Sequence, residues 1–203
     1  AVNPGPATAA ALEHDGAIMA ARGQRLFILA LGKAALPMAA GAASTARRHG
    51  LEITGGVIVG PAQEPSPDPA LEVIAGDHPE PLAGSLAAAN ALGRIAQSIR
   101  PGDHAWVLLS GGATSLIGAP VEGLTQEGLR SLYAALLASG LDIAQMNRIR
   151  KRFTRWGGGK LAVALSGAAV RQLIVSDVIG DDLAAIGSGP LIGDPTTAQE
   201  IHE

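Results

Sequence analysis

The sequence predicts an α/β fold in which a mostly parallel sheet carries helices on both faces. Its apolar residues gather in short, almost continuous runs, as in strands that are buried on both sides of a parallel sheet. Helical stretches of about ten or more residues separate the runs, and this alternation favours parallel strands joined by helical crossovers. A length of 203 residues is enough for one domain with a sizeable core.

Four apolar runs are predicted to form strands. They are "RLFILALG" (25–32), "ITGGVIVG" (53–60), "HAWVLLSGG" (104–112) and "VRQLIVSDV" (170–178). The stretch "LEVIAGDHP" (71–79) is a weaker fifth candidate. The proline-rich segment "GPAQEPSPDPA" (60–70) is typical of a surface loop between two elements.

Helices are predicted between these runs. Residues 34–49 are small and apolar with a basic end before Gly50, and residues 82–98 are rich in alanine at helical spacing. Thr125 and Asp142 are predicted N-caps of two further helices, "TQEGLRSLYAALLASG" and "DIAQMNRIRKRF". After Pro195 the sequence begins another helical pattern, so we expect this chain to be part of a longer protein.

The composition excludes several classes of function. The absence of cysteine removes disulfides and thiolate chemistry and fits a reducing compartment. A net charge of −3 and an aromatic content of 2% give no footprint for nucleic acid. No apolar stretch reaches the roughly 18 residues of a membrane span, and no signal peptide is recognisable. A cytoplasmic protein without nucleic-acid or membrane partners is expected, and a homodimer is left open.

The ends of two predicted strands carry groups suited to phosphate. Lys33 follows Gly32 at a helix start, where exposed amides attract anions and the ammonium adds charge. The run "VLLSGGATS" offers backbone access at Gly111 and Gly112 and hydroxyls at Ser110, Thr114 and Ser115. The alternative for both is an ordinary turn whose glycines serve only geometry.

The stretch "SDVIGDDLAAIGSGP" gathers three carboxylates at a third strand end. Asp177, Asp181 and Asp182 could hold Mg²⁺, which usually takes one or two carboxylates and completes its shell with water and phosphate oxygens. Gly187, Ser188 and Gly189 would then form a second anion-binding loop. The alternative is that Asp181 and Asp182 cap a surface turn.

Candidates for substrate binding lie in two further segments. They are His78 in "GDHPEP", and Asn147, Arg150 and Lys151 in "MNRIRKR". A guanidinium fork suits a carboxylate or a phosphate. The alternatives are a structural loop histidine and a solvated basic helix face.

Eight short motifs, taken in order, resemble the class II glycerate kinases, which make 2-phosphoglycerate from D-glycerate and ATP and are often labelled hydroxypyruvate reductases. The motifs are "ALGKAA", "GDHPEP", "LLSGGATSL", "SGLDIAQMNRIRK", "GGKLA", "SDVIGDD", "IGSGP" and "DPTT". The resemblance covers almost the whole chain. It implies that residues 1–203 form a truncated N-terminal Rossmann-like domain, with a smaller C-terminal domain of the family absent from this chain.

The resemblance also implies roles for individual residues. Lys33 would be the catalytic lysine that contacts phosphate, Ser110, Gly111 and Gly112 would line the phosphate loop, and the three aspartates would serve the magnesium–nucleotide region. ATP and Mg²⁺ are the implied cofactors, and D-glycerate or a related hydroxy acid is the implied substrate. The chain alone is expected to be inactive.

Two rival functions remain open. A nicotinamide-dependent hydroxypyruvate reductase would need a G-x-G-x-x-G turn after the first strand, and "LGKAALP" lacks it. A non-catalytic module that binds a nucleotide or a sugar phosphate is the other alternative.

Overall fold

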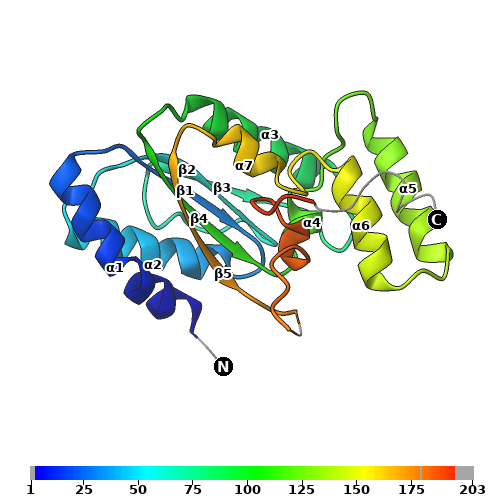
Figure 1. Cartoon of the computed structure of the whole chain (residues 1–203), viewed down its shortest axis with the longest axis horizontal. Helices are drawn as coiled ribbons and strands as arrows, with labels where there is room; N and C mark the ends of the chain where they lie inside the picture. The colour runs from blue at the N-terminus through cyan, green and yellow to red at the C-terminus, as the bar shows by residue number, and fades with distance from the viewer. Residues whose placement is uncertain (1–2, 179, 195–203) are drawn as a thin grey trace.

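The fold is built around one five-stranded, all-parallel sheet, seen in a computed structural model that describes residues 3–178 and 180–194 (Figure 1). The strand order is β3-β2-β1-β4-β5. The bounds are β1 Leu26–Leu31, β2 Ile53–Gly60, β3 Leu71–Ala75, β4 His104–Ser110 and β5 Ala169–Val175. All four predicted strands and the weaker fifth candidate are confirmed, as is the α/β class.

The strand order reverses at the centre of the sheet. The chain moves from β1 outward through β2 to β3, then returns to the other side of β1 for β4 and β5. Ligands of open α/β sheets bind at such a reversal, outside the carboxyl ends of the strands. The reversal here lies between β1 and β4, which pair in register from Leu26 with His104 to Leu31 with Leu109.

Helices cover both faces of the sheet (Figure 1). On one face lie α1 (Pro4–Arg22) and α2 (Ala35–Arg48), and on the other lie α3 (Ala83–Ser98) and α7 (Lys160–Ala164). β1 explains why two layers form, because its side chains alternate between them. Ile28 belongs to the core shared with α1 and α2, whereas Leu29 belongs to the core shared with α3.

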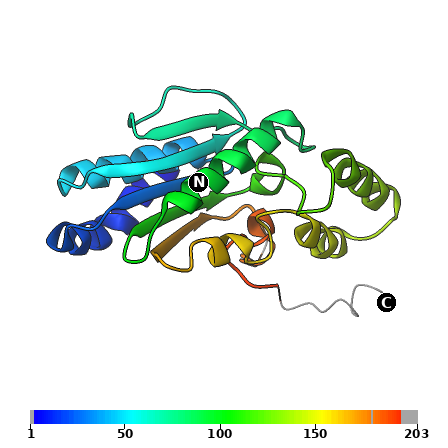
Figure 2. The ribbon, with the colours of Figure 1, turned by 90° about the horizontal axis from the view of Figure 1, so that it is seen from above.

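Two helices stand apart from these layers, beyond the sheet (Figure 2). They are α5 (Gln126–Ala138) and α6 (Ile143–Phe153), and we call residues 125–153 the α5–α6 hairpin. Both predicted N-caps are confirmed: the Gly128 amide donates to Thr125 Oγ1 at 3.0 Å, and Asp142 forms a capping box with Gln145.

The base of the α5–α6 hairpin is formed by the chain entering and leaving it. Pro120 and Thr154 form an isolated antiparallel bridge. The Arg155 amide donates to the Ala119 carbonyl at 2.8 Å, and the Val121 amide donates to the Phe153 carbonyl at 3.1 Å. The hairpin is therefore joined to the sheet through two adjacent chain segments.

Several elements differ from the sequence prediction. α1 was not predicted, because the residues that it buries include small and polar ones such as Thr8 and Gly16. The short helices α4 (Ala113–Leu116) and α7, and the 3₁₀ turn Ile186–Ser188, were not predicted either. The helix expected after Pro195 lies outside the described residues. Within the described part of the chain, no helix has the length and apolar character needed to cross a bilayer.

Candidate functional site

The turns after β1 and β4 lie against each other at this reversal of the strand order. The Lys33 amide donates to the Gly111 carbonyl at 2.9 Å, and the Ala34 amide donates to Ser110 Oγ at 2.9 Å. Gly32 has a φ of +122°, and a Cβ there would lie 2.3 Å from Ser110 Oγ. Only glycine allows this approach, so the residues before Lys33 fix where its side chain begins.

Asp177 reaches the same point from β5, the neighbour of β4. A Cβ built at Gly111 would lie 1.8 Å from Asp177 Oδ2 and 2.5 Å from Oδ1. The carboxylate therefore rests directly against the backbone of Gly111, while the side chain stays exposed to solvent.

Lys33 and His78 border the second glycine. A Cβ at Gly112, where φ is +85°, would lie 3.1 Å from Lys33 Cε and 3.4 Å from His78 Cδ2. Both side chains are exposed. We call Lys33, His78, Gly111, Gly112 and Asp177 the rim. It places an ammonium, an imidazole and a carboxylate around one diglycine turn at the carboxyl edge of the sheet.

Three hydrogen bonds fix the loop that carries His78. Asp77 Oδ2 accepts hydrogen bonds from the amides of Ser85 (2.9 Å) and Leu82 (3.2 Å), at the start of α3. Ser115 Oγ donates to the Pro79 carbonyl at 2.7 Å. Sequence reasoning missed Asp77, because it lies five residues before Leu82, the N-cap of α3, and outside the usual capping spacing.

The predicted phosphate-binding hydroxyls bond within the protein. Ser110 is 2% exposed and its Oγ accepts from the Ala34 amide. Thr114 Oγ1 shares a hydrogen bond of 3.0 Å with Ser188 Oγ, and Ser115 bonds to the loop of His78. These three hydroxyls tie the turns around α4 to one another, which fixes the shape of the rim.

The predicted second anion loop is packed inside the molecule. Gly187, Ser188 and Gly189 are all buried. A Cβ at Gly187 would lie 2.9 Å from Leu109 Cδ1 and 3.1 Å from Ala113 Cβ, so glycine is needed there for close packing. The turn 186–189 therefore packs directly against α4.

The three aspartates do not converge. Among the described residues, no group of three or more His, Asp or Glu side chains is arranged to hold a metal ion. Asp181 and Asp182 are exposed, and Asp182 Oδ1 accepts from the Ala184 amide at 2.9 Å, as a turn-capping aspartate does. Asp177 is the member of the trio that the structure brings to the rim.

The basic candidates on α6 have partners inside the protein. The Arg150 guanidinium lies 4.7 Å from the centre of the Tyr133 ring, and burial raises the pKa of Tyr133 to about 12. The Lys151 side chain is 8% exposed, and its Nζ lies 3.0 Å from Asp194 Oδ1. Asn147 is half-buried.

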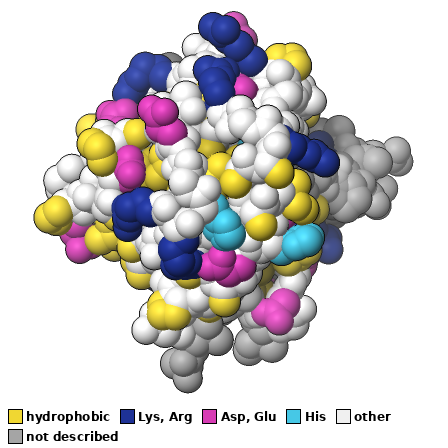
Figure 3. All heavy atoms as spheres, turned by 90° about the vertical axis from the view of Figure 1, so that its left-hand side faces the viewer, with side chains coloured by type: hydrophobic (Ala, Val, Ile, Leu, Met, Phe, Trp, Pro, Cys, Tyr) yellow, Lys and Arg dark blue, Asp and Glu magenta, His cyan; other side chains and the backbone are white. Residues whose placement is uncertain are grey.

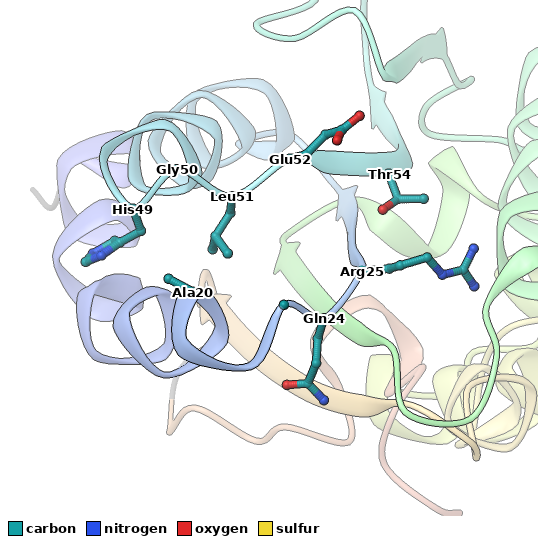
Figure 4. Close-up of a pocket in the computed structure, with 9 residues that line it drawn as sticks. Ala20, Gln24, Arg25, His49, Gly50, Leu51, Glu52 and Thr54 are labelled. Carbon is teal, nitrogen blue, oxygen red and sulfur yellow. The ribbon is translucent and has the colours of Figure 1, made fainter.

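A separate hollow of about 290 Å³ lies at the amino edge of the sheet, at the opposite ends of the strands (Figure 4). Residues that precede or begin β1 and β2 line it, among them Arg25, Glu52 and Thr54. The face on the left-hand side of Figure 1 shows basic and acidic side chains interspersed (Figure 3), without a large patch of one sign. Neither the rim nor the predicted site residues lie in this hollow.

Comparisons with known proteins place this chain in one protein family. All of residues 1–203 match the family described as "Domain of unknown function (DUF4147)". The chain is 36% identical over 176 residues to a glycerate 2-kinase of Pyrococcus horikoshii, and 34% identical over 179 residues to a D-glycerate 2-kinase of Thermotoga maritima. These matches cover 87% of this chain but only 39% and 42% of the relatives.

Solved structures give the same result. A glycerate kinase of Thermotoga maritima superposes with a TM-score of 0.80 at 28% identity, over 97% of this chain and 50% of that protein. A protein of Pyrococcus horikoshii superposes with a TM-score of 0.79 at 35% identity, over 87% of this chain and 39% of that protein.

Proposed function

The chain belongs to the DUF4147 family, the N-terminal domain of glycerate 2-kinase family proteins, and on this premise we propose that the whole protein transfers a phosphoryl group from ATP to the 2-hydroxyl of D-glycerate. The hydroxyl oxygen attacks the γ-phosphorus, the bond to the β-phosphate oxygen breaks, and the hydroxyl proton is lost. The products are 2-phosphoglycerate and ADP.

The arrangement of the rim supports this proposal most directly. Lys33 and Asp177 flank Gly111 and Gly112 at the strand reversal, where α/β folds bind ligands. Phosphoryl transfer depends on cations placed around the phosphates more than on a covalent nucleophile. In our proposal the exposed Lys33 ammonium neutralises charge on the transferred group, and the diglycine turn allows the phosphates to approach the backbone.

The donor set at the rim fits Mg²⁺. A bound magnesium ion usually takes one or two protein carboxylates and keeps water and substrate phosphate oxygens as its other ligands. One exposed carboxylate, Asp177, meets that requirement, and Asp181 and Asp182 follow on the same exposed loop. Mg²⁺ would supply neutralisation of the phosphate oxygens.

The acid substrate is proposed to lie between the rim and the α5–α6 hairpin. His78 borders the diglycine turn, and the loop after it is joined to the start of α5 by the hydrogen bond from Gln126 Nε2 to the Pro81 carbonyl at 3.1 Å. α6 carries Asn147, Arg150 and Lys151 on the hairpin. The half-buried Arg150 guanidinium suits the carboxylate of a hydroxy acid, whereas Lys151 is paired with Asp194.

The test uses the whole protein that contains this chain. Purified protein is incubated with ATP, Mg²⁺ and D-glycerate, and the product is passed to enolase, which consumes 2-phosphoglycerate but not the 3-phospho isomer. We expect enolase to act without an added mutase. A product that enolase leaves unchanged would place the phosphate on another hydroxyl. Oxidation of NADH by hydroxypyruvate, in place of ADP formation, would instead support the reductase.

Replacement of Lys33 tests the role of the rim in the same assay. Removing one preorganised electrostatic contact typically lowers turnover by about a hundred- to a thousandfold, so we expect a loss of that order in Lys33→Ala. Because the Lys33 side chain is exposed, the melting temperature of Lys33→Ala should match that of the wild type. Arg130→Ala, which removes an exposed cation from α5, is the control. Turnover of Lys33→Ala within a few-fold of the wild type would rule out this role.

A further inference from the structure

Lys160 is bound by backbone carbonyls in a way that no proposed role above uses. Its Nζ donates to the carbonyls of Lys151 (2.8 Å), Arg152 (3.3 Å), Thr154 (3.1 Å) and Gly157 (3.2 Å). An ammonium has three protons, so the four acceptors share them. Desolvation lowers the pKa of the Lys160 amine, as expected for a cation withdrawn from water.

Three of the four carbonyls lie at the end of α6, and the fourth, that of Gly157, lies in the turn that follows. Lys151 and Arg152 belong to the last turn of α6, and Thr154 follows its final residue, Phe153. The last carbonyls of a helix have no partner within the helix, and a cation at this end also interacts favourably with the helix dipole. Lys160 therefore closes the C-terminal end of α6 from a different helix, α7.

The carbonyls that Lys160 binds belong to the segment that attaches the α5–α6 hairpin to the sheet. Thr154, whose carbonyl Lys160 binds, forms the antiparallel bridge with Pro120 where the chain enters the hairpin. The hairpin stands beyond the helical layers of the sheet (Figure 2), and outside this base it also has the hydrogen bond from Gln126 Nε2 to the Pro81 carbonyl. A restraint at the base therefore contributes to the direction of both helices.

Hydrogen bonds connect this base to the rim. The Gly158 amide donates to the Ser188 carbonyl, and the Gly159 amide donates to the Gly189 carbonyl, both at 2.9 Å. Ser188 Oγ in turn shares a hydrogen bond with Thr114 Oγ1 in α4, which begins directly after Gly112. Lys160 thus lies where the hairpin, the buried turn 186–189 and the diglycine segment meet.

We propose that Lys160 is a positioning residue that holds the α5–α6 hairpin at the carboxyl edge of the sheet, so that the basic helix α6 binds the carboxylate of the hydroxy acid. The four hydrogen bonds to backbone carbonyls support this restraint of the hairpin, which we call the carbonyl clamp, and its effect on the acid rests on the proposed function. Lys160 itself does not contact the substrate. Its loss should therefore affect binding of the acid more than binding of the nucleotide.

Hydrogen exchange of the backbone amides tests the clamp without any need for activity. Lys160→Met keeps the length of the side chain but removes its donors. We expect amides of residues 142–155 to exchange about ten- to a hundredfold faster, as for a lost hydrogen bond to a charged group. Amides of β1 and β4 should change less than about twofold. Lys160→Arg, which keeps the cation, should retain more protection than Lys160→Met.

A matched control and a second variant make the result decisive. Arg130→Met removes a cation from the same hairpin, but from an exposed pair with Glu127, and should leave exchange unchanged. If Lys160→Met does not fold, Lys160→Gln, which keeps two N–H donors, takes its place. Unchanged exchange at 142–155, or an equal increase in β1 and β4, would overturn the clamp.

Steady-state kinetics of the whole protein test whether Lys160 affects binding of the acid. We expect Lys160→Met to raise the KM for D-glycerate at least about tenfold and to change the KM for ATP less than about threefold, with Lys160→Arg intermediate. Equal increases in both KM values would refute the assignment of the hairpin to the acid. An inactive wild type would refute the proposed function, while the exchange experiment would still decide the clamp.

Discussion

At the scale of single residues, the contact between Gly111 and Asp177 sets the shape of the rim. A Cβ at Gly111 would lie 1.8 Å from Asp177 Oδ2, far inside any real contact. The φ of Gly111 is not among the positive values, so an alanine there would meet the neighbouring carboxylate and would not strain the backbone. The effect of a substitution can therefore be assigned to one pair.

We expect Gly111→Ala to lower the free energy of unfolding by less than about 1 kcal/mol, because the carboxylate must move away but is the exposed, flexible end of its side chain. Adding Asp177→Ala should restore most of that loss, since the obstructing atoms are gone. Urea denaturation of the two single variants and the double variant measures the coupling. Gly55→Ala is the control, because its Cβ would lie an ordinary 3.5 Å from Phe27 Cε1. Additive effects of the two substitutions would contradict the contact.

The rim also shows which part of the site can be predicted from sequence. Lys33, Gly111 and Asp177 follow strand-like runs, so their place at a carboxyl edge could be predicted from the residues alone. In the sheet, β5 is the neighbour of β4, and this pairing brings Asp177 to Gly111. The inward hydrogen bonds of Ser110 and Thr114 depend on backbone turns distant in sequence, and no local pattern signals them.

At the scale of elements, α1 and α2 pack through unusually close backbones. A Cβ at Gly41 in α2 would lie 2.2 Å from the Gly5 carbonyl oxygen and 3.2 Å from the Ala9 nitrogen. These are backbone atoms, which cannot rotate away as the end of a side chain can. Small residues at this contact explain why hydrophobic periodicity did not predict α1.

We expect Gly41→Ala to destabilise the protein by about 1–3 kcal/mol through separation of the two helices, less the gain of about 1 kcal/mol in helix propensity. The matched control is Gly128→Ala in α5, where the nearest atom is the flexible end of Leu124 at 2.8 Å. That variant should be neutral or slightly stabilised. Chemical denaturation compares the two, and equal stability of both variants would argue against the close contact of α1 and α2.

Helix ends were predicted better than helix contacts. Thr125 and Asp142 cap α5 and α6 as their residue types indicate, because a cap is made within three residues of itself. Lys160 was not predicted to have a role. It closes α6 from outside that helix, through carbonyls that become neighbours only after the chain has turned at Gly157, Gly158 and Gly159.

At the scale of the whole molecule, the two edges of the sheet serve different purposes. The carboxyl edge carries the rim, with the exposed side chains of Lys33, His78 and Asp177. The amino edge instead joins β1 to the turn before β4, where Asp103, with a side chain 8% exposed, accepts a hydrogen bond of 2.9 Å from Arg25 Nε. The Arg100 amide donates to the same carboxylate at 2.6 Å. This pair is therefore suited to stability.

The hydrogen bond from Arg25, with a smaller contribution from the Arg100 amide, lowers the pKa of Asp103 in the folded protein, against the opposing effect of burial. The unfolded carboxyl has a pKa of about 3.9, so the contribution of Asp103 is fully present above that pH and is lost as the pH falls through the lower, folded pKa.

We expect Asp103→Asn to be less stable than the wild type at pH 7 by about 1.5–3 kcal/mol, nearer the lower value because Arg25 is 40% exposed and stays partly solvated. The difference between the two proteins should shrink as the pH is lowered from 5 to 2, because the wild-type carboxyl then becomes neutral too. Unfolding free energies at steps across this range measure it. Glu72→Gln, which breaks an exposed pair with Arg94, should show little difference at any pH. A difference for Asp103→Asn that stays constant down to pH 2 would mean that side-chain shape, and not ionisation, makes this residue stabilising.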